Sequence, residues 1–302
     1  MIEAKIPDAY RSTLRLGTCS WKYDSWKGLV YDHKKSYRPD DYLADYARIL
    51  NTVEIDQWFW SLFPSGAKLP ELETVRKYAE SVPSDFIFSV KAPNAITLTH
   101  YYNRETVRGA TGKPNPHFLD HGLLAQFLDR LSPLGKKLGP VMFQFEYLNK
   151  QKMASLERFC ELFGGFLAKA PRGFLYAVEI RNPNYLSSSF FNFLKENGLG
   201  FVYLEGYYMP PIGEVFDRFN PQTAPFSVIR LHGGHRAEIE ADTGKAWNRI
   251  VSPQPASLQA AARIVRASTR RRALTYANLN NHFEGSAPLS IERFLEELKA
   301  PG

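Results

Sequence analysis

Eight short runs rich in β-branched and aromatic residues recur along this 302-residue chain, and a helix-forming stretch follows each of them. Their starts extend from residue 14 to residue 273, a mean repeat of about 37 residues. Eight strand–helix units predict an α/β fold, a single (β/α)8 TIM barrel. A doubly wound sheet is disfavoured because no Gly-rich phosphate-binding motif follows the first run. The strands are expected at residues 14–20, 52–56, 86–91, 140–144, 176–181, 200–205, 226–232 and 273–280.

The segments between the runs predict the outer helices and three irregular insertions, which follow the third, sixth and seventh strands. The insertion after the sixth strand, up to Pro225, is rich in proline and is expected to be at most partly helical. No shift in composition marks a domain boundary, so we expect one domain over residues 1–302, with residues 1–13 as an N-terminal extension. Helices are expected near residues 40–50, 69–81, 119–131, 153–168, 188–197, 257–268 and 291–299.

The composition excludes several classes of protein. The two cysteines, Cys19 and Cys160, form no C-x-x-C motif, which disfavours a zinc ribbon or a disulfide scaffold. No stretch approaches about 18 apolar residues, and residues 1–16 are too charged to resemble a signal peptide. We therefore expect a cytoplasmic protein with no membrane association. The net charge of +7 is compatible with an anionic ligand or with nucleic acid.

Polar residues recur near the carboxyl ends of the expected strands, where the active sites of TIM barrels lie. Val53 and Ile55 form the apolar face of the second run, so Glu54 and Asp56 should point into the lumen. Because such lumens usually hold aliphatic residues, a ring of charges here predicts a site. The alternative is that the opposite charges only neutralise each other. The same alternation directs inward Lys91, Gln144, Glu179, Arg181, Glu205, Arg230 and His232, and it places Asn278 and Asn280 on one face.

Several sequence blocks, taken in order, carry a resemblance to a known family. They include GTCSWKYDSWKG at 17–28, NTVEID at 51–56, FIFSVK at 86–91, GPVMFQ at 139–144, VEIRNP at 178–183, RLHG at 230–233 and NNH at 280–282. Together they resemble the YecE-like family (DUF72), which groups TIM-barrel proteins of unknown function. The resemblance covers nearly the whole chain; it implies the barrel fold and implies no reaction.

The chain departs from the pattern of that family at a few positions near the expected site. Asp56 stands where the family has Asn, and Glu146 and Tyr147 stand where it has a pair of prolines. Glu205 replaces the usual Asp, and the segment after Asn281 is atypical. We therefore expect the ligand preference of this chain to differ from that of its relatives.

Two carboxylates and one histidine are the candidates for acid/base chemistry: Glu54, Glu179 and His232. Carboxylates with different neighbours separate in pKa, which assigns them different roles. An arginine should keep Glu179 ionised, which leaves Glu54 as the better general base. His232 is a natural proton shuttle, or alternatively a residue that only makes structural hydrogen bonds.

The candidates for ligand binding are cations and exposed rings. Arginine and lysine suit a phosphate or carboxylate, and aromatic residues in the loops after the strands suit sugar rings or nucleobases. The alternative for the aromatic residues is that they plug the mouth of the barrel or pack under loops. The expected ligand-binding residues are Lys91, Arg181, Arg230, Asp56, Gln144, Asn280, Trp21 and Trp58.

We expect no metal and no cofactor. A metal would need three or more acidic or histidine side chains of the lumen to converge, and no spacing typical of metal ligands supports this. The candidates would be Glu54, Asp56, Glu179, Glu205, His232 and His282. The sequence also lacks a serine nucleophile elbow.

These patterns favour an enzyme that acts at the carboxyl end of the barrel. We expect a hydrolase, isomerase or lyase whose ligand is anionic: a phosphorylated sugar, a nucleotide or nucleic acid. Two alternatives stay open. One is a non-catalytic protein that binds nucleic acid through its positive surface, and the other is a structural or interaction protein whose lumen charges serve stability alone. The sequence names no substrate and no oligomeric state.

Overall fold

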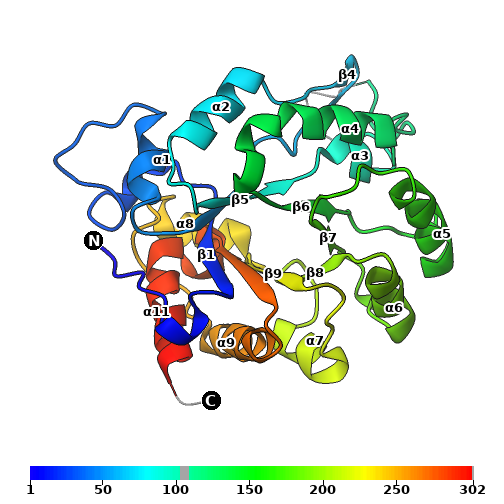
Figure 1. The fold of residues 1–302 in the computed structure, drawn as a ribbon. Helices are drawn as coiled ribbons and strands as arrows, with labels where there is room; N and C mark the ends of the chain where they lie inside the picture. Colours follow the sequence, from blue (N-terminus) through cyan, green and yellow to red (C-terminus); the bar gives the residue numbers. More distant parts are fainter. Residues whose placement is uncertain (103–108, 301–302) are drawn as a thin grey trace.

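A computed structural model describes residues 1–102 and 109–300 of the chain, and Figure 1 shows its ribbon. Eight parallel strands close into a barrel in the order β1-β10-β9-β8-β7-β6-β5-β2, which confirms the predicted (β/α)8 fold. Each expected run supplies one barrel strand. The strands are β1 (Leu14–Cys19), β2 (Thr52–Ile55), β5 (Ile87–Lys91), β6 (Leu138–Gln144), β7 (Tyr176–Glu179), β8 (Gly200–Glu205), β9 (Phe226–Leu231) and β10 (Leu274–Leu279).

Helices surround the barrel and cover the apolar outer faces of its strands (Figure 1). Polar caps begin several of them: the Asp120 side chain accepts two backbone N–H bonds at the start of α4, and Ser155 and Ser187 cap α5 and α6. None of the described helices is both long enough and apolar enough to cross a membrane. The outer helices are α1 (Asp41–Tyr46), α2 (Leu72–Glu80), α4 (His121–Arg130), α5 (Leu156–Leu167), α6 (Ser188–Glu196), α7 (Ile212–Phe219), α9 (Pro255–Arg270) and α11 (Ala287–Lys299).

The three predicted insertions contain short elements that the sequence patterns do not indicate. The insertion after β5 holds α3 (Asn94–Thr97), the one after β8 leads into α7, and the one after β9 holds α8 (Arg236–Thr243). A further short helix, α10 (Asn281–Glu284), follows β10. An antiparallel hairpin of β3 (Leu62–Phe63) and β4 (Gly66–Ala67) follows β2. Apart from α7 and α8, these elements have four residues or fewer, and α8 is mainly polar. Hydrophobic periodicity therefore could not reveal them.

The amino-terminal half of the lumen is a small apolar core, separate from the core under the helices. Its side chains point inward from neighbouring strands and pack against one another, as is usual for this fold. The buried members of this cluster are Met142, Ala177, Val202, Ala224, Phe226, Val228 and Tyr276.

One predicted side-chain direction is wrong. Phe201 and Tyr203 of β8 pack against the helices, so Glu205, two residues further, also faces outward. Its Oε2 accepts the backbone N–H of Ile212 at 3.1 Å, at the start of α7. Since every residue from Phe201 to Leu204 is apolar, this strand carries no alternation from which the direction of Glu205 could be predicted.

Candidate functional site

The carboxyl end of the lumen is closed by a buried ion cluster centred on Arg230 of β9. The guanidinium Nε and Nη2 donate to Oε2 and Oε1 of Glu54 on β2, at 2.7 and 2.8 Å. Its Nη1 donates to Oε2 of Glu179 on β7. The side chains of all three residues are at most 1% exposed. Alternation along the strands therefore brings together residues that are distant in the sequence. Arg230 is separated from Glu179 by 51 positions and from Glu54 by 176.

Two further cations join this cluster from the side of the mouth. Lys91 Nζ lies 3.4 Å from Glu54 Oε1, and its side chain is 8% exposed. Arg181 donates from Nε and Nη2 to Glu179 Oε1 at 3.1 and 3.0 Å, and its side chain is 21% exposed. Exposure thus increases from Arg230 through Lys91 to Arg181, and the last two form the accessible part of the cluster.

Both carboxylates of the cluster are ionised at neutral pH. Burial alone would raise the pKa of Glu54, but the charges of Arg230 and Lys91 outweigh burial and leave this pKa below its usual value. For Glu179 the opposing charges of Arg230 and Arg181 overcome burial and lower the pKa to about 2. Carboxylates held this firmly in the ionised form are weak proton acceptors.

Asp56, just beyond the end of β2, has the opposite tendency. Burial raises its pKa, the charge of Lys91 opposes this, and the charge of Glu54 adds to it. The residue is only partly buried, whereas Glu54 is fully buried. Asp56 therefore differs from Glu54 and Glu179, because its surroundings disfavour the ionised form of its carboxyl group.

His232 follows β9 at the mouth and is neutral at pH 7. Burial, followed by the positive charges of Arg230, Lys91 and Arg181, holds the pKa of His232 well below its ordinary value. Its Nε2 lies 3.4 Å from the hydroxyl of Tyr207 and 3.5 Å from Nδ2 of Asn280. A neutral imidazole in this position has one nitrogen with a lone pair for proton transfer.

A chain of polar contacts extends from His232 to the surface. The Asn280 carbonyl Oδ1 accepts hydrogen bonds from the backbone N–H and ring Nδ1 of His282, at 2.9 and 2.8 Å. The His282 Nε2 lies 3.0 Å from Glu240 Oε1 on α8. The backbone bond fixes which end of the Asn280 amide faces His282, so the amide NH2 must face His232. Sequence analysis did not identify Glu240, because α8 carries no recognisable motif.

The loop after β8 covers part of the mouth in a strained conformation. Tyr207 and Tyr208 have positive φ angles of 54° and 63°, which are unfavourable for aromatic residues. The Tyr207 ring lies 4.0 Å from Arg181 Cζ and 4.7 Å from the His232 ring. Gly206 makes this approach feasible, because a Cβ there would lie 2.4 Å from the carbonyl oxygen of Gly233. Strain of this kind is concentrated at functional sites.

An open groove of about 680 Å³ lies beside this loop. Its position at the ends of β6, β7 and β8 is that of a TIM-barrel active site. Arg181 is the residue shared by this groove and the ion cluster. The groove is lined by Glu146, Tyr147, Arg181, Pro183, Asn184, Tyr207 and Tyr208.

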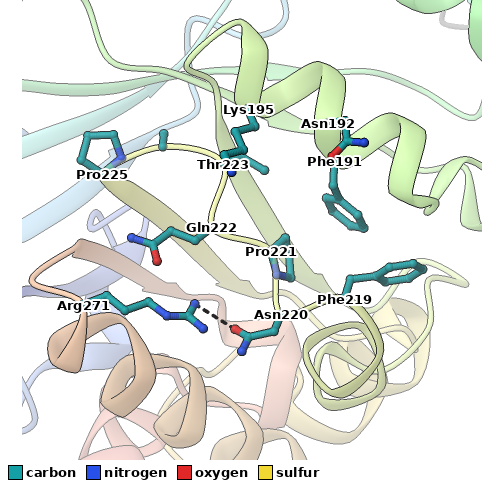
Figure 2. Close-up of a pocket in the computed structure, with 11 residues that line it drawn as sticks. Phe191, Asn192, Lys195, Phe219, Asn220, Pro221, Gln222, Thr223, Pro225 and Arg271 are labelled. Atoms are coloured by element: carbon teal, nitrogen blue, oxygen red, sulfur yellow. Dashed lines mark hydrogen bonds between the residues drawn. The ribbon is translucent and has the colours of Figure 1, made fainter.

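A second cavity, of about 740 Å³, lies at the opposite end of the barrel (Figure 2). It is bounded by the end of α6 and by the loops that precede β9 and β10. Arg271 donates there to Oδ1 of Asn220 at 2.9 Å, and Figure 2 shows Lys195 and Phe191 on the other side. Of the described residues that line this cavity, none is Asp, Glu or His. Its described lining thus offers no carboxylate or imidazole, so we do not take it as the candidate site.

The remaining predicted residues occupy different environments. Gln144, level with Glu179, is 8% exposed, and its Oε1 is buried without a hydrogen-bond partner among the described residues. Trp21 is buried with its edge toward Tyr78, and Trp58 stacks on the same ring with centroids 6.0 Å apart. Trp21 thus belongs to the main hydrophobic core, and Trp58 packs against it. Within residues 1–102 and 109–300, no three His, Cys, Asp or Glu side chains form a group that could hold a metal ion.

Comparisons with known proteins agree with the fold. A family model described as a protein of unknown function, DUF72, matches residues 15–302. The structure of a DUF72 family protein from Enterococcus faecalis is similar, with a TM-score of 0.63, 20% identity and 96% of each chain covered. A DUF72 family protein from Thermotoga maritima has the same TM-score and identity, over 95% of this chain and 100% of the other. No curated protein matches the sequence.

Proposed function

This chain belongs to the DUF72 family, and because the function of that family is unknown, we propose a function from the geometry of the mouth. We propose an enzyme that binds an anionic ligand at the carboxyl end of the barrel. The ligand classes that fit are phosphorylated sugars, nucleotides and nucleic acid. The reaction is a hydrolysis, or a proton abstraction as in an isomerase or lyase.

One observation supports this proposal most strongly: the buried cluster has more cations than firmly ionised carboxylates. Among the described residues, the ion pairs of Arg230, Arg181 and Lys91 are formed with two carboxylates, Glu54 and Glu179. Asp56, whose pKa is raised by burial, lies close enough to feel the charge of Lys91, and a bound anion would add a further negative charge at the mouth. An anion at the mouth would meet Lys91 and Arg181, the two cations nearest to solvent.

Arg181 is suited to this role because part of its guanidinium stays available. Nε and Nη2 are bonded to Glu179, and the face stacks on Tyr207, whereas Nη1 has no partner among the described residues. Arg230 is fully buried with its donors directed at carboxylates, so we assign it to positioning Glu54 and Glu179. The free Oε1 of Gln144 adds an acceptor for a ligand hydroxyl or amide.

We assign proton transfer to Asp56 and His232. Glu54 lies under the cluster and has a lowered pKa, so it is a weaker base than sequence reasoning expected. Asp56 is more exposed and has a raised pKa, and His232 is neutral and partly exposed. Glu179 keeps Arg181 in place and stays ionised. The contacts with Asn280 and Tyr207 orient the imidazole of His232.

The proposal is tested first by ligand binding. We would screen inorganic phosphate, phosphorylated sugars and nucleotides by thermal stabilisation, then measure affinity by calorimetry. The key variant is Arg181→Gln, and the matched control is Arg263→Gln, an exposed arginine paired with Asp217 on the outer helices. A ligand that stabilises the wild type and the control, but binds Arg181→Gln at least tenfold more weakly, supports the anion site.

Turnover then separates the enzyme from its alternatives. For any ligand that binds, we expect product formation that is lost in Asp56→Asn and His232→Asn while the ligand still binds. Binding without turnover in the wild type would favour a non-catalytic binding protein. If no member of the screen binds, the lumen charges serve stability alone and the proposal fails.

A further inference from the structure

The exposed aromatic residues of the protein gather around the mouth. Of the described large hydrophobic side chains, five are strongly exposed, and the three aromatic ones are Trp60, Tyr147 and Tyr208. They follow β2, β6 and β8, so all three open on the carboxyl face of the barrel. Their exposed fractions are 45%, 59% and 98%. Because rings of this size are normally buried, such a grouping indicates a binding surface.

The spacing of these rings requires an extended ligand. In the barrel, β2 and β6 are separated by β5, and β6 and β8 by β7. Two strand spacings are about 10 Å. One sugar or one base cannot contact rings on all three loops. A linear polymer that follows the rim can do so, with one of its own rings stacked on each aromatic side chain.

Cations alternate with these rings. Lys68 lies after the hairpin near Trp60, and Lys150 lies three residues after Tyr147; both are exposed and form no ion pair with any described residue. Arg181 lies in the groove between Tyr147 and Tyr208. Among the described residues that line the groove, Glu146 is the one carboxylate, and it is already paired with Lys152 at 2.5 Å. A ligand polymer with a negative charge between successive rings matches this order. A neutral polysaccharide would form no ion pairs with these cations.

Tyr208 supplies independent support. Its left-handed backbone is unfavourable, and its side chain, 98% exposed, gains no packing in return. A strained residue whose ring points into solvent is explained by contact with a partner. Stacking on an open base provides that contact, and it is sequence-tolerant because every base has two faces.

We propose that the rim formed by Trp60, Tyr147 and Tyr208, with Lys68, Lys150 and Arg181, binds single-stranded nucleic acid in an extended conformation. The bases stack on the three rings and the backbone phosphates meet the cations. Single strands fit better than duplexes, because the bases of a duplex are already stacked on one another. The inference rests on the proposed function in one respect: one phosphate of the strand occupies the inner site at Arg181 and Lys91.

The test is fluorescence anisotropy with fluorescein-labelled oligothymidylates of 2 to 12 nucleotides and a 12-base-pair duplex. We expect affinity to rise at least tenfold from the dinucleotide to the longest single strand, and the single strand to bind more tightly than the duplex. Tyr147→Ser and Tyr208→Ser should each weaken the long strand roughly tenfold. Lys150→Gln should reduce the slope of log K against log salt by about 0.7.

The controls distinguish this inference from the proposed function. Leu72→Ser, which removes an exposed side chain without a ring, should bind like the wild type. This variant, the two tyrosine variants and Lys150→Gln should all keep the melting temperature of the wild type. Affinity that does not depend on length, yet is lost in Arg181→Gln, would leave the inner site intact and overturn the rim. Displacement of the long strand by a neutral hexasaccharide would also overturn it, in favour of a polysaccharide. If no oligonucleotide binds while a phosphorylated sugar does, the rim proposal alone fails. If no oligonucleotide and no member of the ligand screen binds, both proposals fail.

Discussion

The two halves of the barrel lumen are built from the same strands and differ completely in chemistry. β9 supplies Val228 to the amino-terminal half and Arg230 to the carboxyl-terminal half; β7 supplies Ala177 and Glu179 in the same way. The apolar half satisfies the packing requirement of a closed barrel. The charged half must overcome the desolvation of five ionic groups, so stability alone does not explain it. The comparison indicates that the amino-terminal half maintains the fold and the carboxyl-terminal half carries the function.

The sharpest way to break this comparison is to remove the centre of the charged half. Arg230→Met would leave Glu54 and Glu179 buried without their main partner. We expect the free energy of unfolding to fall by about 3–5 kcal/mol, measured by urea denaturation. A loss below about 1 kcal/mol would mean that water reaches the carboxylates freely, and the contrast between the two halves would be invalid.

A neutralised variant gives the matched control. Arg230→Met combined with Glu54→Gln and Glu179→Gln removes the arginine together with both buried charges. We expect most of the lost stability to return, because replacing a whole ion cluster by neutral groups is far less costly than removing one partner. Ligand binding should not return with it.

The apolar half should respond in the opposite way. Met142→Ala removes a side chain that is 1% exposed from the small lumen core. We expect the cavity to lower the free energy of unfolding by about 3 kcal/mol. Affinity for an anionic ligand at the mouth should stay within about twofold of the wild type in calorimetry. A large loss of affinity would show that the two halves are coupled and that their division of roles is wrong.

Much of this contrast was predictable from the sequence. Strict alternation in 53–56 and 176–181 correctly directs Glu54 and Glu179 inward, and the eight-fold strand–helix repeat predicts the barrel that brings them together. Alternation fails for Glu205, because the other residues of β8 are apolar on both faces. It also says nothing about distance from the surface. The depth that buries Arg230 fully and leaves Arg181 partly exposed follows from the stagger of the strands, which no local pattern encodes.

Acid should affect the charged half first. The pKa of Glu179 is about 2 in the folded protein, against an ordinary value of 4.5. The pKa of Glu179 is lower in the folded state than in the unfolded state. The contribution of this carboxylate to stability is therefore complete above about pH 5 and is lost as the pH falls toward 2. We expect the difference in unfolding free energy between the wild type and Glu179→Gln to narrow over this range, on the order of 2 kcal/mol. Met142→Ala should differ from the wild type by the same amount throughout.

The smallest change in the free energy of unfolding is expected at the rim, and there a substitution should increase stability, whereas the preceding ones decrease it. A left-handed backbone costs a non-glycine residue about 1 kcal/mol, and glycine loses about 0.5 kcal/mol more chain entropy on folding. Because Tyr208 is 98% exposed, Tyr208→Gly sacrifices no packing and should raise the free energy of unfolding by about 0.5 kcal/mol. Tyr208→Ala keeps the backbone penalty and should give no gain. Increased stability together with weaker oligonucleotide binding would show that the strained loop conformation is needed for ligand binding. A loss of stability would mean that the ring packs against the protein.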